Sequence, residues 1–404
     1  MKKVWEQKQI GDVCDVVNGG TPKTTVPEYW GGSHLWITPA EMGKRLSPFV
    51  DDTERKITDL GLRDSSARLL PPNSVILSSR APIGYLVINN KPMATNQGCR
   101  GLIPRERIQS KFLYHYLSSI VDLLNSLGTG ATFKELSGGK LKEVTIPVPP
   151  LPEQQRIVRI LDEAFEGIAT AKANAEKNLQ NARALFESYL EAVFSQRGEG
   201  WEEKPLGDVC DLLNGFAFKS EDAVPESQTQ LVRMGNLYGN RLDLDRSPVF
   251  YSDRFAADYR RYLLKEGDII MSLTGTTGKE DYGYAVSIPA CDHALLMNQR
   301  IVKFDSIRED LVNGDYLLHY LRSRVFLNIL YPTANGTRQA NLSSVTIKTL
   351  PIPLCSIQEQ KKIASSLEAL SGETQRLESL YQRKLAALEE LKKSLLHQAF
   401  NGEL

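Results

Sequence analysis

Apolar residues recur every three or four positions along two long stretches of the chain, 153–197 and 358–404. Neither stretch contains proline, and both are rich in Ala, Leu, Glu, Lys, Gln and Arg, which favour helices. The pattern therefore predicts two helices, each roughly 60 Å long at ~1.5 Å per residue. Their apolar stripes are Ile157, Leu161, Ala164 and Ile168 in the first helix, and Ile363, Leu367, Leu370, Leu377, Leu388, Leu391 and Leu395 in the second.

A long helix with one narrow apolar stripe is unstable alone in water, so each predicted helix needs a partner. We expect the two helices to pair with each other as an antiparallel coiled coil. The alternative is that each helix only caps its own domain.

The remaining segments, 1–152 and 198–357, alternate short apolar runs with Gly, Pro, Asn and Ser. Runs such as 74–88 and 267–288 predict pairs of strands joined by a loop. Helical spacing returns in "KFLYHYLSSIVDLLNSL" and "DYLLHYLRSRVFLNIL". The two segments are therefore predicted to be α+β domains with mostly antiparallel sheets.

An internal repeat explains this order of elements. The stretch "GDVCDVVNGG" begins at Gly11, and "GDVCDLLNGF" begins at Gly207. The helical stretches also end alike, in "SYLEAVF" and "SLLHQAF". We therefore divide the chain into domain 1 (1–152), a central helix (153–197), domain 2 (198–357) and a C-terminal helix (358–404), and expect the two copies to be related by a pseudo-twofold axis.

The loops of the two domains differ although their frames match. "GGTPKTTVPEYWGGSHLWITPAEM" in domain 1 stands where domain 2 has "GFAFKSEDAVPESQTQLVRMGNLY". Structural support alone does not require such divergence, whereas recognition of two different targets does. The repeat therefore favours a protein that reads two targets.

Composition adds few constraints. The 404 residues include 49 Lys and Arg and 49 Asp and Glu, and this zero net charge argues mildly against nucleic-acid binding. Five well-separated cysteines predict reduced thiols. The sequence shows no run of ~18 apolar residues and no secretory signal at its start, so we expect a cytoplasmic protein without a membrane partner.

Catalytic motifs are not evident. "TGTTGKE" (274–280) lacks the Walker spacing and predicts a hairpin tip. "DDTERK" (51–56) places Glu54 and Lys56 after an acidic pair, the bare outline of a nuclease site. We predict no catalytic residue, metal or cofactor in this chain, and hence a binding or scaffolding protein that is not itself an enzyme.

Polar loop residues beside aromatic ones are the candidates for binding DNA. Arg can read guanine and Asn or Gln can read adenine in the major groove, while Lys and Thr contact phosphates. Asn96/Gln97 and Asn298/Gln299 recur at matching places, so the alternative for them is a role in strand geometry. The candidates are Lys23, Thr24, Arg80, Asn96, Gln97, Arg100, Thr132 and Lys134 in domain 1, and Lys219, Arg233, Asn236, Lys279, Asn298, Gln299, Arg300, Arg338 and Gln339 in domain 2.

Four motifs together resemble the specificity subunit of type I restriction-modification systems. They are "IPVPPLPEQQRIVRILD", the weaker "LPIPLCSIQEQKKIASSLE", "LGDVCDLLNG" and the ending "LLHQAFNGEL". The second motif departs from the family pattern by an extra residue, which places Ile357 where Pro152 would align. The resemblance covers the whole chain.

The resemblance implies two target-recognition domains joined by two helices that form an antiparallel coiled coil. Each domain would read one half of a bipartite, asymmetric site in double-stranded DNA, and the coiled coil would set the gap. Two DNA adenine methyltransferase subunits carrying S-adenosylmethionine would dock on it. Motor-nuclease subunits that use ATP and Mg would join them.

Two rival functions remain open. One is a protein scaffold without base-specific DNA readout. The other is a nuclease built around Glu54 and Lys56.

Overall fold

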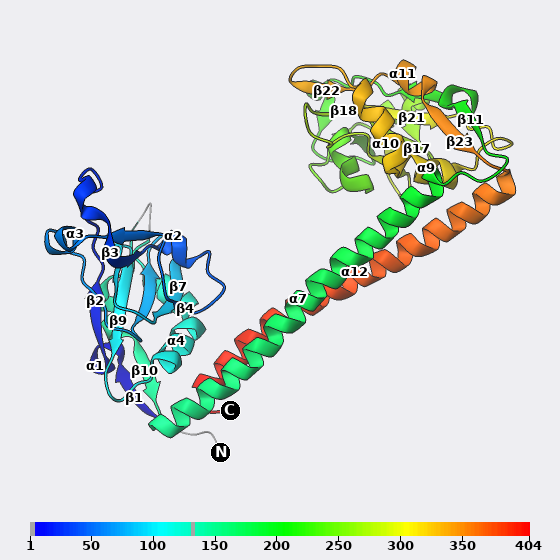
Figure 1. Cartoon of the computed structure of the whole chain (residues 1–404). Helices are drawn as coiled ribbons and strands as arrows, with labels where there is room; N and C mark the ends of the chain where they lie inside the picture. Colours follow the sequence, from blue (N-terminus) through cyan, green and yellow to red (C-terminus); the bar gives the residue numbers. More distant parts are fainter. Residues whose placement is uncertain (1–4, 131–133) are drawn as a thin grey trace. The chain divides into compact units, whose positions relative to one another are not determined.

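The structure is a computed structural model that describes residues 5–130 and 134–404. It divides into two compact units, one formed by the chain up to Glu176 with Gln382–Leu404, and the other by Lys177–Tyr381. Each unit contains one α+β domain and parts of both long helices, α7 (Leu151–Ser195) and α12 (Ile357–Phe400) (Figure 1). The predicted fold class, two α+β domains with two long helices, is confirmed.

Domain 1 is built on a five-stranded sheet in the order β2-β9-β6-β7-β4, beside a three-stranded sheet β5-β3-β8 and the pair β1-β10. Most neighbours are antiparallel, and β3-β8 and β4-β7 are parallel. Its strands are β1 (Glu6–Gln9), β2 (Cys14–Asn18), β3 (Trp30–Ile37), β4 (Phe49–Val50), β5 (Arg55–Ile57), β6 (Val75–Ser79), β7 (Ile83–Asn89), β8 (Met93–Thr95), β9 (Cys99–Pro104) and β10 (Thr145–Val148). Its helices are α1 (Ile10–Val13), η1 (Pro27–Tyr29), α2 (Pro39–Met42), α3 (Asp59–Arg63), α4 (Ser110–Ser119), α5 (Val121–Leu127) and α6 (Gly138–Glu143).

Domain 2 likewise contains two main sheets, the four-stranded β12-β21-β17-β19 and the five-stranded β13-β15-β14-β20-β16. Two pairs of strands, β18-β22 and β11-β23, complete it. Its strands are β11 (Glu202–Pro205), β12 (Asp211–Asn214), β13 (Ala223–Val224), β14 (Thr229–Val232), β15 (Phe250–Tyr251), β16 (Leu263–Leu264), β17 (Ile269–Ser272), β18 (Thr274–Thr276), β19 (Ala285–Ser287), β20 (Ala294–Met297), β21 (Ile301–Asp305), β22 (Gln339–Asn341) and β23 (Pro351–Leu354). Its helices are η2 (Leu206–Asp208), η3 (Ser220–Asp222), η4 (Met234–Asn240), α8 (Arg254–Asp258), η5 (Arg260–Tyr262), α9 (Gly314–Arg322), α10 (Arg324–Leu330), η6 (Tyr331–Thr333) and α11 (Ser344–Thr349).

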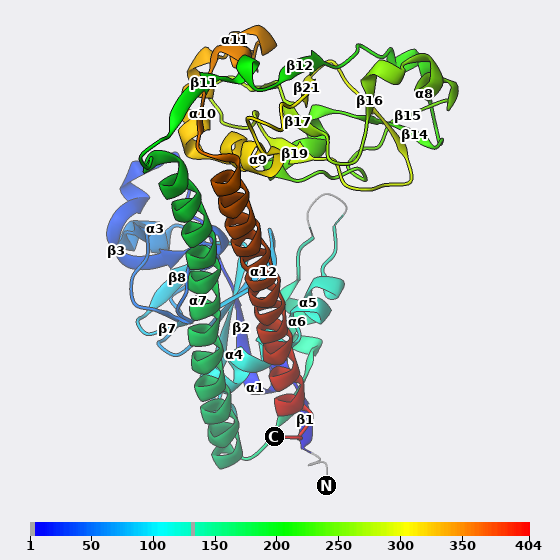
Figure 2. The same ribbon diagram turned by 90° about the vertical axis from the view of Figure 1, so that its right-hand side faces the viewer.

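Each domain core includes residues from both long helices. In domain 1, Ile157 and Leu161 of α7 pack in one apolar cluster with Leu396 and Ala399 of α12. In domain 2, the corresponding cluster contains Leu190 and Phe194 of α7 together with Ala364 and Leu367 of α12. The start of each helix therefore packs in one unit with the end of the other helix, so α7 and α12 run antiparallel within each unit (Figures 1 and 2).

The aromatic residue near the end of each long helix anchors it to a domain. Phe400 lies edge-on to Phe112 and Tyr116, with ring centroids 5.2 Å apart in both pairs. Phe194 makes the same contacts, at the same distance, with Tyr316 and Tyr320. The matching sequence ends "SYLEAVF" and "SLLHQAF" thus encode equivalent docking contacts.

The predicted stripe residues differ in burial. Ile157, Leu161 and Leu367 are fully buried, whereas Leu391 is 47% exposed and does not belong to a buried interface. The others are half-buried: Ala164, Ile168, Ile363, Leu370, Leu377, Leu388 and Leu395. The ends of the stripes pack into the domain cores, and each helix contributes to both cores, so the alternative in which each helix only caps its own domain is wrong.

A buried glutamine fixes the start of each long helix. Gln154 is fully buried, accepts a hydrogen bond from the Gln109 N–H, and donates to the carbonyls of Arg107 and Pro149. Gln360 accepts from the Asn313 N–H and donates to the carbonyls of Leu311 and Cys355. Each amide therefore ties a domain loop to a helix start.

These contacts correct the sequence alignment of the two proline-rich segments. Gln154 and Gln360 are equivalent, and α7 begins at Leu151 where α12 begins at Ile357. Strand pairing agrees, because Glu6 faces Val148 and Glu202 faces Leu354. The second segment thus has no extra residue, and Ile357 corresponds to Leu151 and not to Pro152.

Candidate nucleic-acid interface

A close backbone approach explains the repeated "NG" of the two frames. A Cβ on Gly19 would lie 1.9 Å from the Asn96 carbonyl oxygen, and one on Gly215 would lie 2.2 Å from that of Asn298. The Asn96 side chain accepts from the Gly98 N–H, and that of Asn298 accepts from the Arg300 N–H. Asn96 and Asn298 therefore shape the turns between neighbouring strands, and these turns carry Gln97 and Gln299 outward.

In domain 2, one of these turns borders a hollow that contains three arginines. The arginine hollow, as we name it, has a volume of about 520 Å³ and lies between η4 and the 298–300 turn. Arg233, Arg246 and Arg300 line it together with Gln299, Asn298 and Phe218, and none of the described residues that line it is acidic. Its chemistry suits an anion.

A second hollow, the amide hollow, lies on the other side of the same turn and shares Gln299 and Arg300 with the first. Its volume is about 630 Å³. Amide side chains of Asn214, Gln339 and Asn341 line it, with hydroxyl groups from neighbouring residues. Amide groups both donate and accept hydrogen bonds, as base edges do.

The remaining predicted residues of domain 2 fall into two groups. Lys279 and Arg338 are exposed on the loops extending from the paired strands β18 and β22. Lys219 is exposed and forms an ion pair with Glu221 at 3.4 Å. Asn236 is only 2% exposed, and its amide group bonds to the Arg233 N–H and to two carbonyls. Four predicted residues thus lie together at the hollows: Arg233, Gln299, Arg300 and Gln339. The Asn236 amide instead forms hydrogen bonds within the loop that contains η4.

Domain 1 has a carboxylate where domain 2 has the Asn341 amide. Glu135 and Asn341 each pair with a backbone partner at the base of a loop, Thr129 and Asn335 respectively. The Glu135 carboxylate accepts from Arg100 at 2.7 Å and lies 3.8 Å from Arg80. Arg100 is only 7% exposed. Its guanidinium therefore holds the loop base and is not free to contact a base edge in this structure.

The other predicted residues of domain 1 lie on exposed loops. Lys23, Thr24, Gln97 and Lys134 are all exposed. The Trp30 indole N–H donates to the Lys23 carbonyl at 3.3 Å, which ties the first loop to strand β3. Thr132 lies outside the described residues.

Sequence reasoning missed several residues of these surfaces. The Arg55 guanidinium stacks over Trp30, 3.7 Å from the ring centroid, on an exposed part of the small sheet. Arg246, Asn341 and Glu135 were missed as well. Residue type was the only available signal. Arg55 and Trp30, like Arg246 and Arg300, are too far apart in the sequence for a local pattern to indicate that they lie together.

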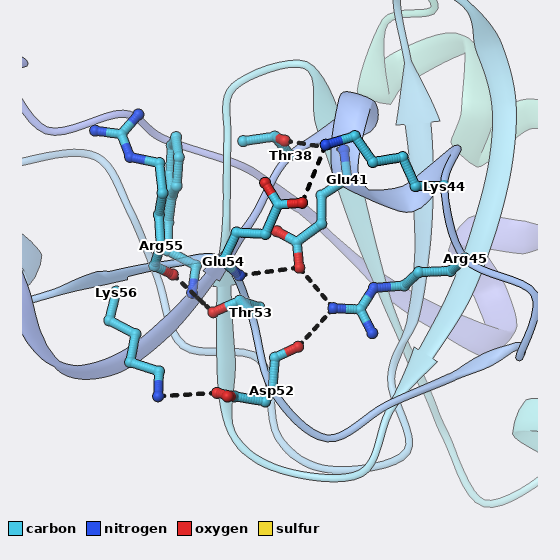
Figure 3. Close-up of polar contacts among 10 residues, drawn as sticks. Thr38, Glu41, Lys44, Arg45, Asp52, Thr53, Glu54, Arg55 and Lys56 are labelled. Atoms are coloured by element: carbon cyan, nitrogen blue, oxygen red, sulfur yellow. Dashed lines mark hydrogen bonds and ion pairs between the residues drawn. The ribbon is translucent and has the colours of Figure 1, made fainter.

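The residues of the proposed nuclease outline pair with neighbouring charges (Figure 3). Glu54 pairs with Lys44 at 3.0 Å, and Lys56 pairs with Asp52 at 2.9 Å. The buried Glu41 accepts from the Glu54 N–H and pairs with an arginine. Across the described part of the chain, no group of three or more His, Cys, Asp and Glu is placed to hold a metal ion. This geometry serves loop packing.

The turn at 274–280 and the two equivalent cysteines agree with the interpretation of the sequence. Thr276 and Asp281 bond across the turn that follows β18, as expected for the predicted hairpin tip in 274–280. Cys14 and Cys210 are buried free thiols at equivalent positions, and burial raises the pKa of each to about 12. No helix within the described ranges has both the length and the apolar character required to cross a bilayer.

Two like-built domains with different polar surfaces define a class of protein with two separate recognition modules. Sequence comparison agrees with this class. Residues 2–180 and 198–387 each match the family described as "Type I restriction modification DNA specificity domain". The chain therefore belongs to the type I restriction-modification DNA specificity family.

Individual relatives point the same way. The chain is 33% identical over 296 residues to the type I restriction enzyme MjaIX specificity subunit of Methanocaldococcus jannaschii, which covers 69% of this chain and 68% of the relative. It is 33% identical over 197 residues to the EcoR124I/EcoR124II specificity subunit of Escherichia coli, covering 47% and 48%.

Solved structures share the fold at low sequence identity. A chain from a study of complex assembly and conformational transition in the type I restriction-modification system matches with a TM-score of 0.77 at 18% identity, covering 99% of this chain and 98% of the other. The crystal structure of the HsdS subunit from Thermoanaerobacter tengcongensis matches with a TM-score of 0.63 at 19% identity, covering 99% and 97%.

Proposed function

We propose that this chain is the DNA-specificity subunit of a type I restriction-modification complex. Each domain reads one half of a bipartite, asymmetric DNA site, and the helix pair fixes the length of the unspecified gap. Two weak half-site contacts add their free energies only when the geometry lets both form at once. A fixed gap therefore increases both affinity and selectivity.

One observation carries this proposal: the frames of the domains match while their polar surfaces differ. Gln154 and Gln360, Phe194 and Phe400, and Gly19 and Gly215 each make equivalent contacts. At the loop base, however, domain 1 has the Arg100–Glu135 pair and domain 2 has an amide. Different polar groups on one frame support readout of two different sequences.

Partner subunits complete the proposed complex. Two DNA adenine methyltransferase subunits would dock on this chain and carry S-adenosylmethionine, and motor-nuclease subunits would bring ATP and Mg. The chain itself would contribute no catalytic group or cofactor and would work in the cytoplasm. Its zero net charge fits a subunit whose partners supply part of the attraction for phosphates.

Alanine substitution separates DNA readout from scaffolding. The pair Arg300→Ala and Arg338→Ala removes exposed cations from domain 2, and we expect methylation of the recognised site to fall at least tenfold after co-expression with the methyltransferase. Assembly, measured by co-purification, should not change. Unchanged methylation in a normally assembled complex would favour the scaffold, and metal-dependent DNA cleavage by the purified chain alone would favour the nuclease.

A further inference from the structure

The two hollows of domain 2 differ in chemistry although they share one turn. We propose, on the basis of the function proposed above, that they divide the work of binding DNA. The arginine hollow binds backbone phosphates, and the amide hollow contacts base edges. Arg300 and Gln299 stand on the turn between them.

The concentration of positive charge is the first argument for a phosphate site. Arg233, Arg246 and Arg300 line one hollow of about 520 Å³ and form no ion pair within the described ranges of the chain. Like charges held together repel one another unless an anion lies between them. The chain as a whole has zero net charge, so composition does not produce this cluster.

Domain 1 places a carboxylate beside its two arginines at the loop base. There, Arg80 and Arg100 approach one carboxylate, that of Glu135, at 3.8 and 2.7 Å. The equivalent position in domain 2 is Asn341, which lines the amide hollow and brings no negative charge to the turn that carries Arg300. The lining of the arginine hollow likewise contains no acidic residue among those the structure describes, so its positive charge is available to a ligand.

Local hydrogen bonds hold the arginine hollow in shape before any ligand binds. Arg233 donates to the Ser247 carbonyl at 2.6 Å. The buried Asn236 amide donates to the carbonyls of Asp243 and Arg246 at 2.8 and 3.1 Å. Asn236 is thus a positioning residue that fixes the segment carrying Arg246, and a preformed site loses less conformational entropy on binding.

The amide hollow has the opposite character. Gln339 and Asn341 stand on β22, and Gln299 lines the same hollow from the 298–300 turn. The Asn341 amide donates to the Gln339 carbonyl at 2.9 Å, which holds the backbone beside the Gln339 side chain. Such groups gain little from an anion, but a glutamine or asparagine amide matches the donor and acceptor of the adenine edge. Phosphate contacts position a protein on DNA, and base contacts give sequence preference.

Salt dependence distinguishes the two roles. The test uses the full chain assembled with its methyltransferase at 50–200 mM salt. It measures binding to a duplex that contains the site that the complex methylates, and to a duplex of random sequence. For Arg233→Gln/Arg246→Gln we expect weaker binding to both duplexes by a similar factor. The slope of log K against log salt should decrease in magnitude by about 0.9 for each phosphate that the variant no longer neutralises.

The amide hollow predicts the converse result. Gln339→Ala should leave the salt slope unchanged and reduce the ratio of site to random binding by about fivefold or more, since a base contact favours one sequence only. Lys265→Gln is the matched control for the arginine variant, because Lys265 is an exposed cation of domain 2 outside both hollows. It should leave the slope and the ratio unchanged.

Three results would overturn the division of roles. They are an unchanged salt slope in the arginine variant, weaker binding to the site duplex alone in that variant, or a reduced slope in Gln339→Ala. If the double variant does not fold, the single variant Arg246→Gln, at an exposed position, takes its place in the same comparison. It should reduce binding to both duplexes by a similar factor and decrease the salt slope. If wild-type complex binds both duplexes equally, the proposed function itself fails.

Discussion

At the residue scale, a few buried polar side chains decide how the repeated frame is assembled. Gln154 and Gln360 each satisfy three backbone groups at a helix start, and each is fully buried. A buried polar group that loses its hydrogen-bond partner destabilises the folded state by more free energy than the bond itself contributes. These two glutamines therefore contribute more to stability than their exposed neighbours.

Replacing Gln154 by alanine tests this role. The change leaves one N–H and two carbonyls without partners, so we expect the free energy of unfolding of domain 1 to fall by about 3 kcal/mol or more. Urea unfolding followed by fluorescence measures it. Gln155→Ala, next to it and exposed, is the control and should change stability by less than about 0.5 kcal/mol. Equal effects of the two changes would contradict the role.

A buried histidine predicts how stability depends on pH. The His319 side chain is 2% exposed, and burial lowers its pKa from 6.5 to about 4. Glu368 lies 3.6 Å away but is 77% exposed, so water screens its charge and burial dominates. His115 of domain 1 is equivalent and its pKa is also lowered by burial, against the opposing effect of Asp162.

The sign follows from the lowered pKa. The unfolded chain takes up the proton below pH 6.5 and the folded chain does so only near pH 4, so stability falls as pH falls through this window. We expect domain 2 to lose about 2 kcal/mol between pH 7 and pH 5 from this group. Urea unfolding of His319→Gln at both pH values should show a smaller loss. An equal loss in both proteins would refute the assignment.

At the element scale, the sequence predicted the long helices better than their contacts. The period of apolar residues predicted α7 and α12, because it depends only on local spacing. It could not show that Ile157 and Leu367 pack into domain cores or that Leu391 is exposed, because tertiary contacts decide burial. The ion pairs Lys172–Glu389 and Arg183–Glu378 involve exposed cations and contribute little stability.

Small buried residues matter more for the helix pair. Ala175 is 1% exposed, although it lies far from both ends of α7. A larger side chain at this position would force its neighbours apart, so Ala175→Leu should destabilise the folded chain by about 1–3 kcal/mol. Ala173→Leu, on the exposed side of the same turn, should have little effect. Thermal unfolding compares them, and equal melting temperatures would contradict close packing at Ala175.

At the scale of the whole molecule, the repeat in the sequence predicted two domains and two helices, and four motifs within the repeated segments indicated the family. The binding surfaces were only partly predictable. Gln299 and Arg300 lie where the repeated "NQ" turn predicts, because a frame contact with Gly215 fixes that turn. The positions of Arg246 and Glu135 at these surfaces were not predictable. Loop conformation alone brings each of them beside residues that are distant in the sequence.

Single-molecule methylation mapping tests the central claim most directly. DNA from cells that express this chain with its methyltransferase should carry methylated adenines in one motif. That motif should consist of two different specified half-sites separated by a gap of constant length. A single uninterrupted motif, a gap of variable length, or methylation without sequence preference would contradict the account.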